Sequence, residues 1–153
     1  MENTVALEFD PLGRLFAATR DGQLVMLDTE TGLALVLGNL GFSAAGDLAI
    51  SQTGTLYMST PNDEIVSLDA SRLGGALTRT AEIVGVTGAD KIFGLAFDSQ
   101  GNLLGFAGSN VYLIDTSNAS ASLLANLQGI GVGQAFGAAA EKSVALTLAC
   151  SSG

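Results

Sequence analysis

The sequence predicts an all-β fold built from three repeated units, because one short pattern occurs three times. In each copy an apolar segment runs into a polar turn that ends in glycine, at Gly13, Gly54 and Gly101. The glycines are 41 residues (13 to 54) and 47 residues (54 to 101) apart, a spacing typical of stacked supersecondary units of four short strands. We therefore expect three four-stranded antiparallel sheets that form the blades of a β-propeller.

The first strand of each unit is expected to be innermost, and it leads directly into the glycine turn. These strands are expected at residues 5–9, 48–50 and 95–97. Each turn begins with Asp10, Ser51 or Asp98, whose side chains can accept hydrogen bonds from their own backbone, and its final glycine accepts a positive φ. The turns are therefore expected to form tight hairpins.

The remaining strands of each unit follow at matching positions. Second strands are expected at 15–19, 56–60 and 103–107, third strands at 24–28, 65–69 and 111–115, and fourth strands at 34–37, 80–84 and 122–125. The second and third strands are apolar without regular alternation, which is typical of strands covered on both faces, as a blade is by its neighbours. Outermost strands are expected to be short and variable.

The end of the third strand repeats in sequence and predicts both core and turn residues. Leu27, Leu68 and Ile114 each precede an aspartate and are expected in the core. The aspartates themselves, Asp28, Asp69 and Asp115, are interpreted as turn formers, because aspartate readily bonds to nearby backbone and a catalytic group is rarely needed in every blade.

Composition excludes several classes of function. The formal net charge of −9 repels phosphate backbones and anionic membrane surfaces, so we expect neither nucleic acid nor membrane as a partner. There is no histidine, which excludes a Ser-His-Asp triad and histidine-ligated metals, and the single Cys150 excludes an internal disulfide. No signal peptide is recognised at Met1, so the protein is expected to be cytoplasmic or to have lost a leader.

The repeated phrase occurs in full at residues 95–103 as LAFDSQGNL, and apolar strands end in Asp28-Thr29 and Asp115-Thr116. This pattern resembles the blades of bacterial NHL-like and YVTN-like propellers. The resemblance covers about residues 4 to 137 and is specific for the blade rather than for an activity. The WD-repeat variety is not supported, because there is no tryptophan.

The number of units is smaller than in such families, whose rings have at least four blades. We expect one partial propeller domain over residues 1–153, with blades at about 4–44, 45–92 and 93–132 and a remnant or closing strand at 133–148. Three blades leave two apolar faces open, which predicts that two copies close a six-bladed ring around a two-fold axis. A fragment of a longer propeller would associate in a similar way.

Binding residues are expected in the loops that enter the innermost strands and in the turns between middle strands, because both emerge on one face. The candidates, which a protein, glycan or small-molecule ligand would contact, are Arg20, Asp21, Phe42, Asp47, Asn62, Asp63, Glu64, Asp90, Lys91, Phe93 and Asn110. We favour a non-enzymatic binding module without a cofactor. The alternative, suggested by resemblance to calcium-dependent six-bladed propeller enzymes, is a carboxylate- or calcium-dependent hydrolase or lyase, which requires several converging carboxylates.

Overall fold

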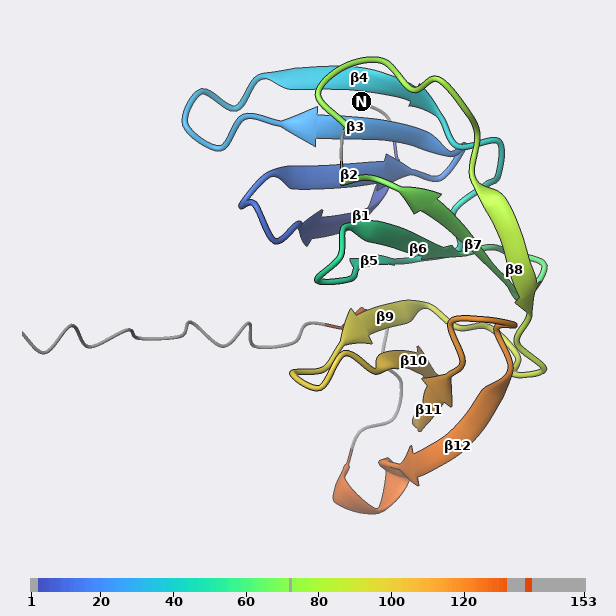
Figure 1. The fold of residues 1–153 in the computed structure, drawn as a ribbon. Helices are drawn as coiled ribbons and strands as arrows, with labels where there is room; N and C mark the ends of the chain where they lie inside the picture. Colours follow the sequence, from blue (N-terminus) through green and yellow to red (C-terminus); the bar gives the residue numbers. More distant parts are fainter. Residues whose placement is uncertain (1–2, 72, 132–136, 139–153) are drawn as a thin grey trace, which may run out of the picture.

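The computed structural model describes residues 3–71, 73–131 and 137–138, and these contain three four-stranded antiparallel sheets (Figure 1). Blade 1 comprises β1 (Thr4–Phe9), β2 (Leu15–Thr19), β3 (Gln23–Leu27) and β4 (Ala34–Asn39). Blade 2 comprises β5 (Leu48–Ile50), β6 (Thr55–Ser59), β7 (Glu64–Asp69) and β8 (Glu82–Val86). Blade 3 comprises β9 (Gly94–Phe97), β10 (Leu103–Ala107), β11 (Asn110–Ile114) and β12 (Ala121–Asn126).

Each sheet keeps its strands in chain order, and neighbouring strands are joined by short connections except β7 and β8, whose connection is long. The innermost strands β1, β5 and β9 lie toward the middle of the molecule, and β4, β8 and β12 form its outer rim (Figure 1). The described residues contain only one helical segment, the short 3₁₀ helix η1 (Gln128–Ile130). The predicted all-β class and the three four-stranded antiparallel sheets are confirmed.

The glycine turns have the geometry that their sequence predicts. Their glycines all adopt positive φ, with values of 79° at Gly13, 84° at Gly54 and 85° at Gly101. Asp10 Oδ1 accepts the Arg14 N–H at 2.8 Å, and Asp98 Oδ1 accepts the Asn102 N–H at the same distance. The carboxylates of Asp10 and Asp98 therefore stabilise local turns, as expected.

The fourth strand of blade 2 begins later than expected, at Glu82 rather than residue 80. The reason is a contact with the preceding blade: the Ala81 N–H donates to the Leu40 carbonyl at 2.8 Å, so this part of the backbone bonds to blade 1 instead of β7. The connection between β7 and β8 thus runs along blade 1 before it enters its own sheet.

Two hydrophobic cores lie between successive blades. In the first, Phe16, Leu24 and Leu37 of blade 1 belong to the same buried cluster as Leu48 and Met58 of blade 2. The second is made by blades 2 and 3, and its fully or nearly fully buried members include Ala49, Ile65, Leu95, Leu103 and Ile114. The middle blade is therefore covered on both faces.

The predicted core triplet is only partly correct. Leu68 and Ile114 are buried, but Leu27 is only half-buried. Leu68 packs in the core between blades 1 and 2, and Ile114 packs in the core between blades 2 and 3. Leu27 occupies the matching position in blade 1, and the described residues contain no blade that packs on that side of it.

Candidate functional site

The connections before β5 and β9 and the turns β2–β3 and β6–β7 are joined to one another by hydrogen bonds. The Ala44 N–H donates to the Arg20 carbonyl at 3.0 Å, and the Ala45 N–H donates to the Ser59 carbonyl at 2.9 Å. The Lys91 N–H donates to Asp63 Oδ1 at 2.9 Å. Residues from blades 1 and 2 and from the entrance to blade 3 are therefore held in one cluster, which we call the loop face.

A pocket of about 320 Å³ opens on the loop face. Four of the sequence-predicted binding residues line it, namely Arg20, Asp63, Lys91 and Phe93. Ala44, Ala45, Thr60 and Pro61 complete the lining. The pocket thus combines two cationic side chains with an aromatic ring and small apolar groups.

Arg20 and Lys91 are exposed, and in the part of the chain that the structure describes neither side chain forms an ion pair. The ion pair found there joins Arg14 to Asp10 instead. The whole chain has only 6 lysines and arginines against 15 acidic residues, and the lining of this pocket contains two of these cations and one acidic side chain, that of Asp63. Such side chains can bind a carboxylate, and arginine can do so with two parallel hydrogen bonds.

The backbone of this pocket is held in an unusual conformation. Asp63 and Lys91 have φ of 59° and 57°, in the left-handed region that residues other than glycine rarely adopt. The hydrogen bond from the Lys91 N–H to the Asp63 side chain connects these two positions directly. Strained residues of this kind gather at binding sites, where the surrounding structure must fix them.

The packing of Gly46 fixes the wall of the pocket beside Phe93. A Cβ atom at residue 46 would lie 2.6 Å from the Phe93 carbonyl oxygen, closer than real Cβ contacts allow. Only glycine therefore permits the connection before β5 to approach the connection before β9 this closely. The sequence gives no sign of this contact, since Gly46 is one of 20 glycines.

Several other predicted residues lie on the loop face but do not line the pocket. Asp21, Asn62 and Asp90 are exposed there, and Glu64 accepts a hydrogen bond from the Thr60 hydroxyl at 3.2 Å. Phe42 packs against the core between blades 1 and 2. Asn110 lies in β11 of blade 3 and pairs with Asn126, whose Nδ2 donates to its Oδ1 at 2.6 Å.

Asp47 is buried beneath the loop face and joins the innermost strands of two blades. Its Oδ1 accepts the Leu48 N–H at 2.9 Å, and its Oδ2 accepts the N–H groups of Leu95 at 3.1 Å and Ala138 at 3.2 Å. Burial raises the pKa of this carboxyl to about 6, although the three backbone donors oppose the shift and Glu8 adds to it. Most of the predicted closing segment 133–148 lies outside the described residues, but Gly137 and Ala138 reach β9 here.

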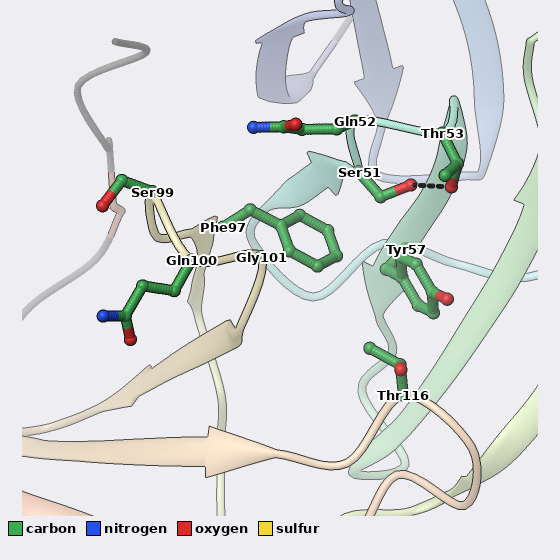
Figure 2. Close-up of a pocket in the computed structure, with 9 residues that line it drawn as sticks. All are labelled: Ser51, Gln52, Thr53, Tyr57, Phe97, Ser99, Gln100, Gly101 and Thr116. Carbon is green, nitrogen blue, oxygen red and sulfur yellow. Dashed lines mark hydrogen bonds between the residues drawn. The ribbon is translucent and has the colours of Figure 1, made fainter.

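A second hollow, of about 300 Å³, lies between the glycine turns of blades 2 and 3. Figure 2 shows the Tyr57 and Phe97 rings next to each other in this hollow, with the hydroxyls of Ser51 and Thr53 bonded nearby at 2.9 Å. The ring centroids are 5.6 Å apart and the rings meet edge to face. This arrangement is favourable for aromatic pairs and fastens blade 3 to blade 2.

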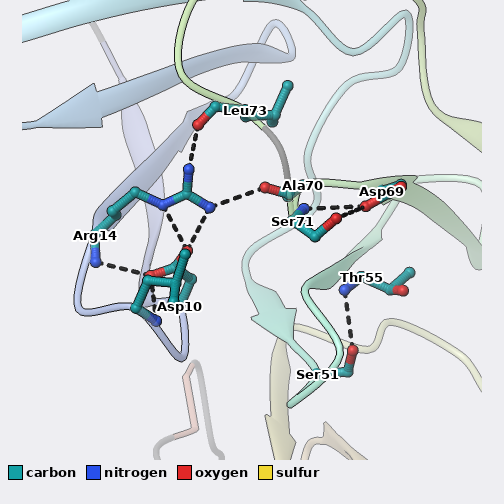
Figure 3. A network of polar contacts seen from close by, with 9 residues as sticks. Asp10, Arg14, Ser51, Thr55, Asp69, Ala70, Ser71 and Leu73 are labelled. Carbon is teal, nitrogen blue, oxygen red and sulfur yellow. Dashed lines mark hydrogen bonds and ion pairs between the residues drawn. The ribbon is translucent and has the colours of Figure 1, made fainter.

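Between the glycine turns of blades 1 and 2, the side chain of Arg14 takes the place of an aromatic pair (Figure 3). Arg14 forms an ion pair with Asp10, and its Nη atoms donate to the carbonyls of Leu73 and Ala70, the latter at 3.0 Å. Its guanidinium carbon lies 5.3 Å from the centroid of the Phe16 ring. The repeat pattern does not indicate these Arg14 contacts, because Thr55 and Asn102 occupy the matching turn positions in the other units.

Carboxylates in the described residues serve mainly as turn formers. Asp28, Asp69 and Asp115 accept the N–H groups of residues two positions ahead, at 2.8 to 3.0 Å. Side-chain and backbone donors lower the pKa of Asp115, and backbone donors lower that of Asp28. Within residues 3–71, 73–131 and 137–138 there is no group of three or more His, Cys, Asp or Glu side chains that could hold a metal ion. No helix in that part of the chain is long and apolar enough to cross a membrane.

The three sheets define this chain as a set of β-propeller blades, and comparison with solved structures supports the same fold. A chain of the nidogen/laminin complex matches with a TM-score of 0.64 and 14% identity, over 88% of this chain and 51% of that one. The WD40 repeats of RRP9 match with a TM-score of 0.55 and 16% identity, over 84% of this chain and 40% of that one. A Bacteroides thetaiotaomicron protein of unknown function matches with a TM-score of 0.59 and 13% identity, over 82% and 32%.

At these identities the likeness concerns the fold alone. The chain spans between about a third and about half of the length of these solved chains. No family model matches the sequence. No curated protein matches it either.

Proposed function

We propose that this chain is a non-enzymatic binding module whose loop face holds a carboxylate-bearing segment of a protein partner. The observation that carries the proposal is the pocket in which Arg20 and Lys91 stand beside Phe93 and Pro61. The two cations suit a carboxylate, and the aromatic and proline surfaces suit an adjoining apolar side chain. The propeller fold of the solved neighbours, which include WD40 repeats, supports an interaction scaffold in general terms.

The acidic character of the chain does not prevent such a ligand from binding. At physiological ionic strength charges further away than about 8 Å are largely screened, so the nearest groups dominate. Asp63 is the acidic member of the pocket lining, and its Oδ1 already accepts the Lys91 N–H at 2.9 Å. Asp21 and Asp90 adjoin the two cations in sequence but do not line the pocket. The side chains of Arg20 and Lys91 remain available to a carboxylate.

A titration followed by amide NMR tests this proposal with a small probe. N-acetyl-phenylalanine carries a carboxylate beside an apolar ring, and N-acetyl-phenylalaninamide is the same probe without the charge. We expect saturable shifts at Lys91 and Phe93 with the acid, and at least tenfold weaker binding of the amide. Arg20→Gln should weaken binding of the acid and leave the weaker binding of the amide unchanged.

Arg79→Gln is the matched control, because Arg79 is exposed and does not line the pocket. Equal binding of acid and amide, or shifts confined to residues outside the loop face, would show that the pocket does not recognise a carboxylate.

A further inference from the structure

Equivalent residues of the three blades differ sharply in exposure on the face that points to the preceding blade, here called the trailing face. Leu48 of blade 2 and Leu95 of blade 3 are 0% and 1% exposed, because the preceding blade covers them. Leu7 occupies the same place in blade 1 and is 53% exposed. The cross-strand register places Leu7, Ala17, Val25 and Val36 in one row of this trailing face. Ala17 and Val25 are 0% exposed, and Val36 is about as exposed as its equivalents Ile83 and Leu123, so the difference between the blades is carried by Leu7.

The opposite, leading face shows the same difference at the other end of the chain. Each pairing of third and fourth strands contains a register shift at the matching place, which leaves Leu37, Val84 and Leu124 as equivalent extra residues. Leu37 is buried against blade 2, and Val84 packs against the core shared with blade 3. Leu124 of blade 3 is 60% exposed.

Blade 1 therefore leaves part of its trailing face exposed, and blade 3 leaves part of its leading face exposed. Between successive blades within the chain, a leading face packs against a trailing face. The contact between blades 2 and 3 shows how they meet, since Tyr57 of a leading face touches Phe97 of a trailing face. Counted from the glycine turns, Leu104 is the equivalent of Tyr57 and Phe9 is the equivalent of Phe97. In Figure 1 the two end blades, β1–β4 and β9–β12, lie on opposite sides of blade 2.

We propose that a second copy of this chain covers both faces, so that blade 3 of each copy packs on blade 1 of the other and two three-bladed chains form one six-bladed ring. At each new seam Leu104 of one copy contacts Phe9 of the other, as Tyr57 contacts Phe97 within the chain. A copy is the favoured occupant because it supplies both complementary faces at once.

The size of the two seams is sufficient for a stable dimer. A face of four strands, each about five residues long, measures roughly 17 Å by 19 Å. Two seams, each formed by two such faces, therefore bury on the order of 1,200 Å² in total, which is above the roughly 1,000 Å² expected of a biological interface. Closure by a two-fold axis leaves no open face, so association stops at the dimer.

Light scattering on the full chain, with three single variants, tests this inference. We expect twice the monomer mass of 15.4 kDa for the wild type. Leu7→Lys on the trailing face and Leu124→Lys on the leading face should each give the monomer mass with an unchanged circular dichroism spectrum. Val86→Lys is the matched control, because Val86 is 62% exposed but belongs to the middle blade, and it should remain dimeric.

A cross-link identifies the contact itself. In a Cys150→Ser background, Phe9→Cys and Leu104→Cys are placed on separate copies, mixed and treated with a short bis-maleimide. A covalent dimer should form in the mixture and exceed that formed by either variant alone. A wild-type mass of 15.4 kDa with a folded spectrum would overturn the proposal, and so would a dimer that survives both lysine substitutions.

Discussion

The carboxylate of Asp47 accepts the backbone N–H of Leu95 at 3.1 Å and so links the innermost strand of blade 3 to the connection that enters blade 2. Asp47 is only 6% exposed, and its burial raises the pKa of the carboxyl to about 6. A charge held at this position costs free energy that a protonated carboxyl does not. The junction between the two blades should therefore respond to pH.

We predict that stability falls as pH rises from 4.5 to 7. The pKa of Asp47 is raised from 3.8 in the unfolded chain to about 6 in the folded one, so its contribution is fully present below 3.8 and is lost as pH rises through 6. This shift in the pKa of Asp47 corresponds to a change of at most about 3 kcal/mol in the free energy of unfolding. Urea unfolding at pH 4.5 and pH 7 measures it, and Asp47→Asn should remove most of the change. An equal pH dependence in both proteins would contradict this assignment.

Leu68 should be essential to the core between blades 1 and 2. It is 4% exposed and belongs to the buried cluster shared by these blades, so Leu68→Ala is expected to cost roughly 2 to 5 kcal/mol in the free energy of unfolding. Leu33→Ala is the control, since Leu33 is 71% exposed, and it should change stability by less than about 0.5 kcal/mol. Similar losses for both variants in urea denaturation would argue against the observed packing.

Arg14 should stabilise the contact between blades 1 and 2 through its shape as well as its charge. Its guanidinium pairs with Asp10, donates to the Ala70 carbonyl and lies over Phe16. Arg14→Lys keeps the charge but loses the forked donors, and we expect a loss of about 1 to 2 kcal/mol. Arg79→Lys, at an exposed position, should be neutral. An Arg14→Lys protein as stable as the wild type in thermal unfolding would show that a point charge is sufficient.

Gly46 should be required for the shape of the pocket. Gly46→Ala would place a Cβ atom 2.6 Å from the Phe93 carbonyl oxygen, so the two connections must separate. We expect a loss of about 1 to 3 kcal/mol in stability, the usual cost of forcing extra atoms into a close contact, and altered amide shifts at Phe93. Gly74→Ala serves as the control, because nothing lies within 4 Å of its added Cβ. Unchanged Phe93 shifts in Gly46→Ala would contradict the close approach.

The sequence predicts the blades well because their signals are local and repeated. The turn at Asp98 and Gly101 follows from side-chain bonding and a positive φ, both of which depend on a few adjacent residues. Leu27 shows where a repeat misleads. Its sequence matches Leu68 and Ile114, but its burial depends on a neighbouring blade that is absent from the described chain.

The lining of the pocket includes residues that the sequence placed together. Loop positions placed Arg20, Asp63, Lys91 and Phe93 on one face, because the order of strands in a blade decides where its connections emerge. The sequence did not indicate that Asp63 and Lys91 adopt left-handed backbone conformations, or that a hydrogen bond joins these two residues, which are 28 positions apart. It also could not separate Asp47, which is buried, from the exposed carboxylates around it.

The salt dependence of the oligomeric state tests most directly the central claim that the end blades carry complementary apolar faces. Each copy has a net charge of −9, so two copies repel one another while their apolar seams attract. Sedimentation equilibrium of the wild-type chain between 20 mM and 500 mM NaCl should show a dimer whose dissociation constant falls as salt screens the repulsion. A mass of 15.4 kDa at every salt concentration, or a dimer that dissociates as salt is added, would contradict the account.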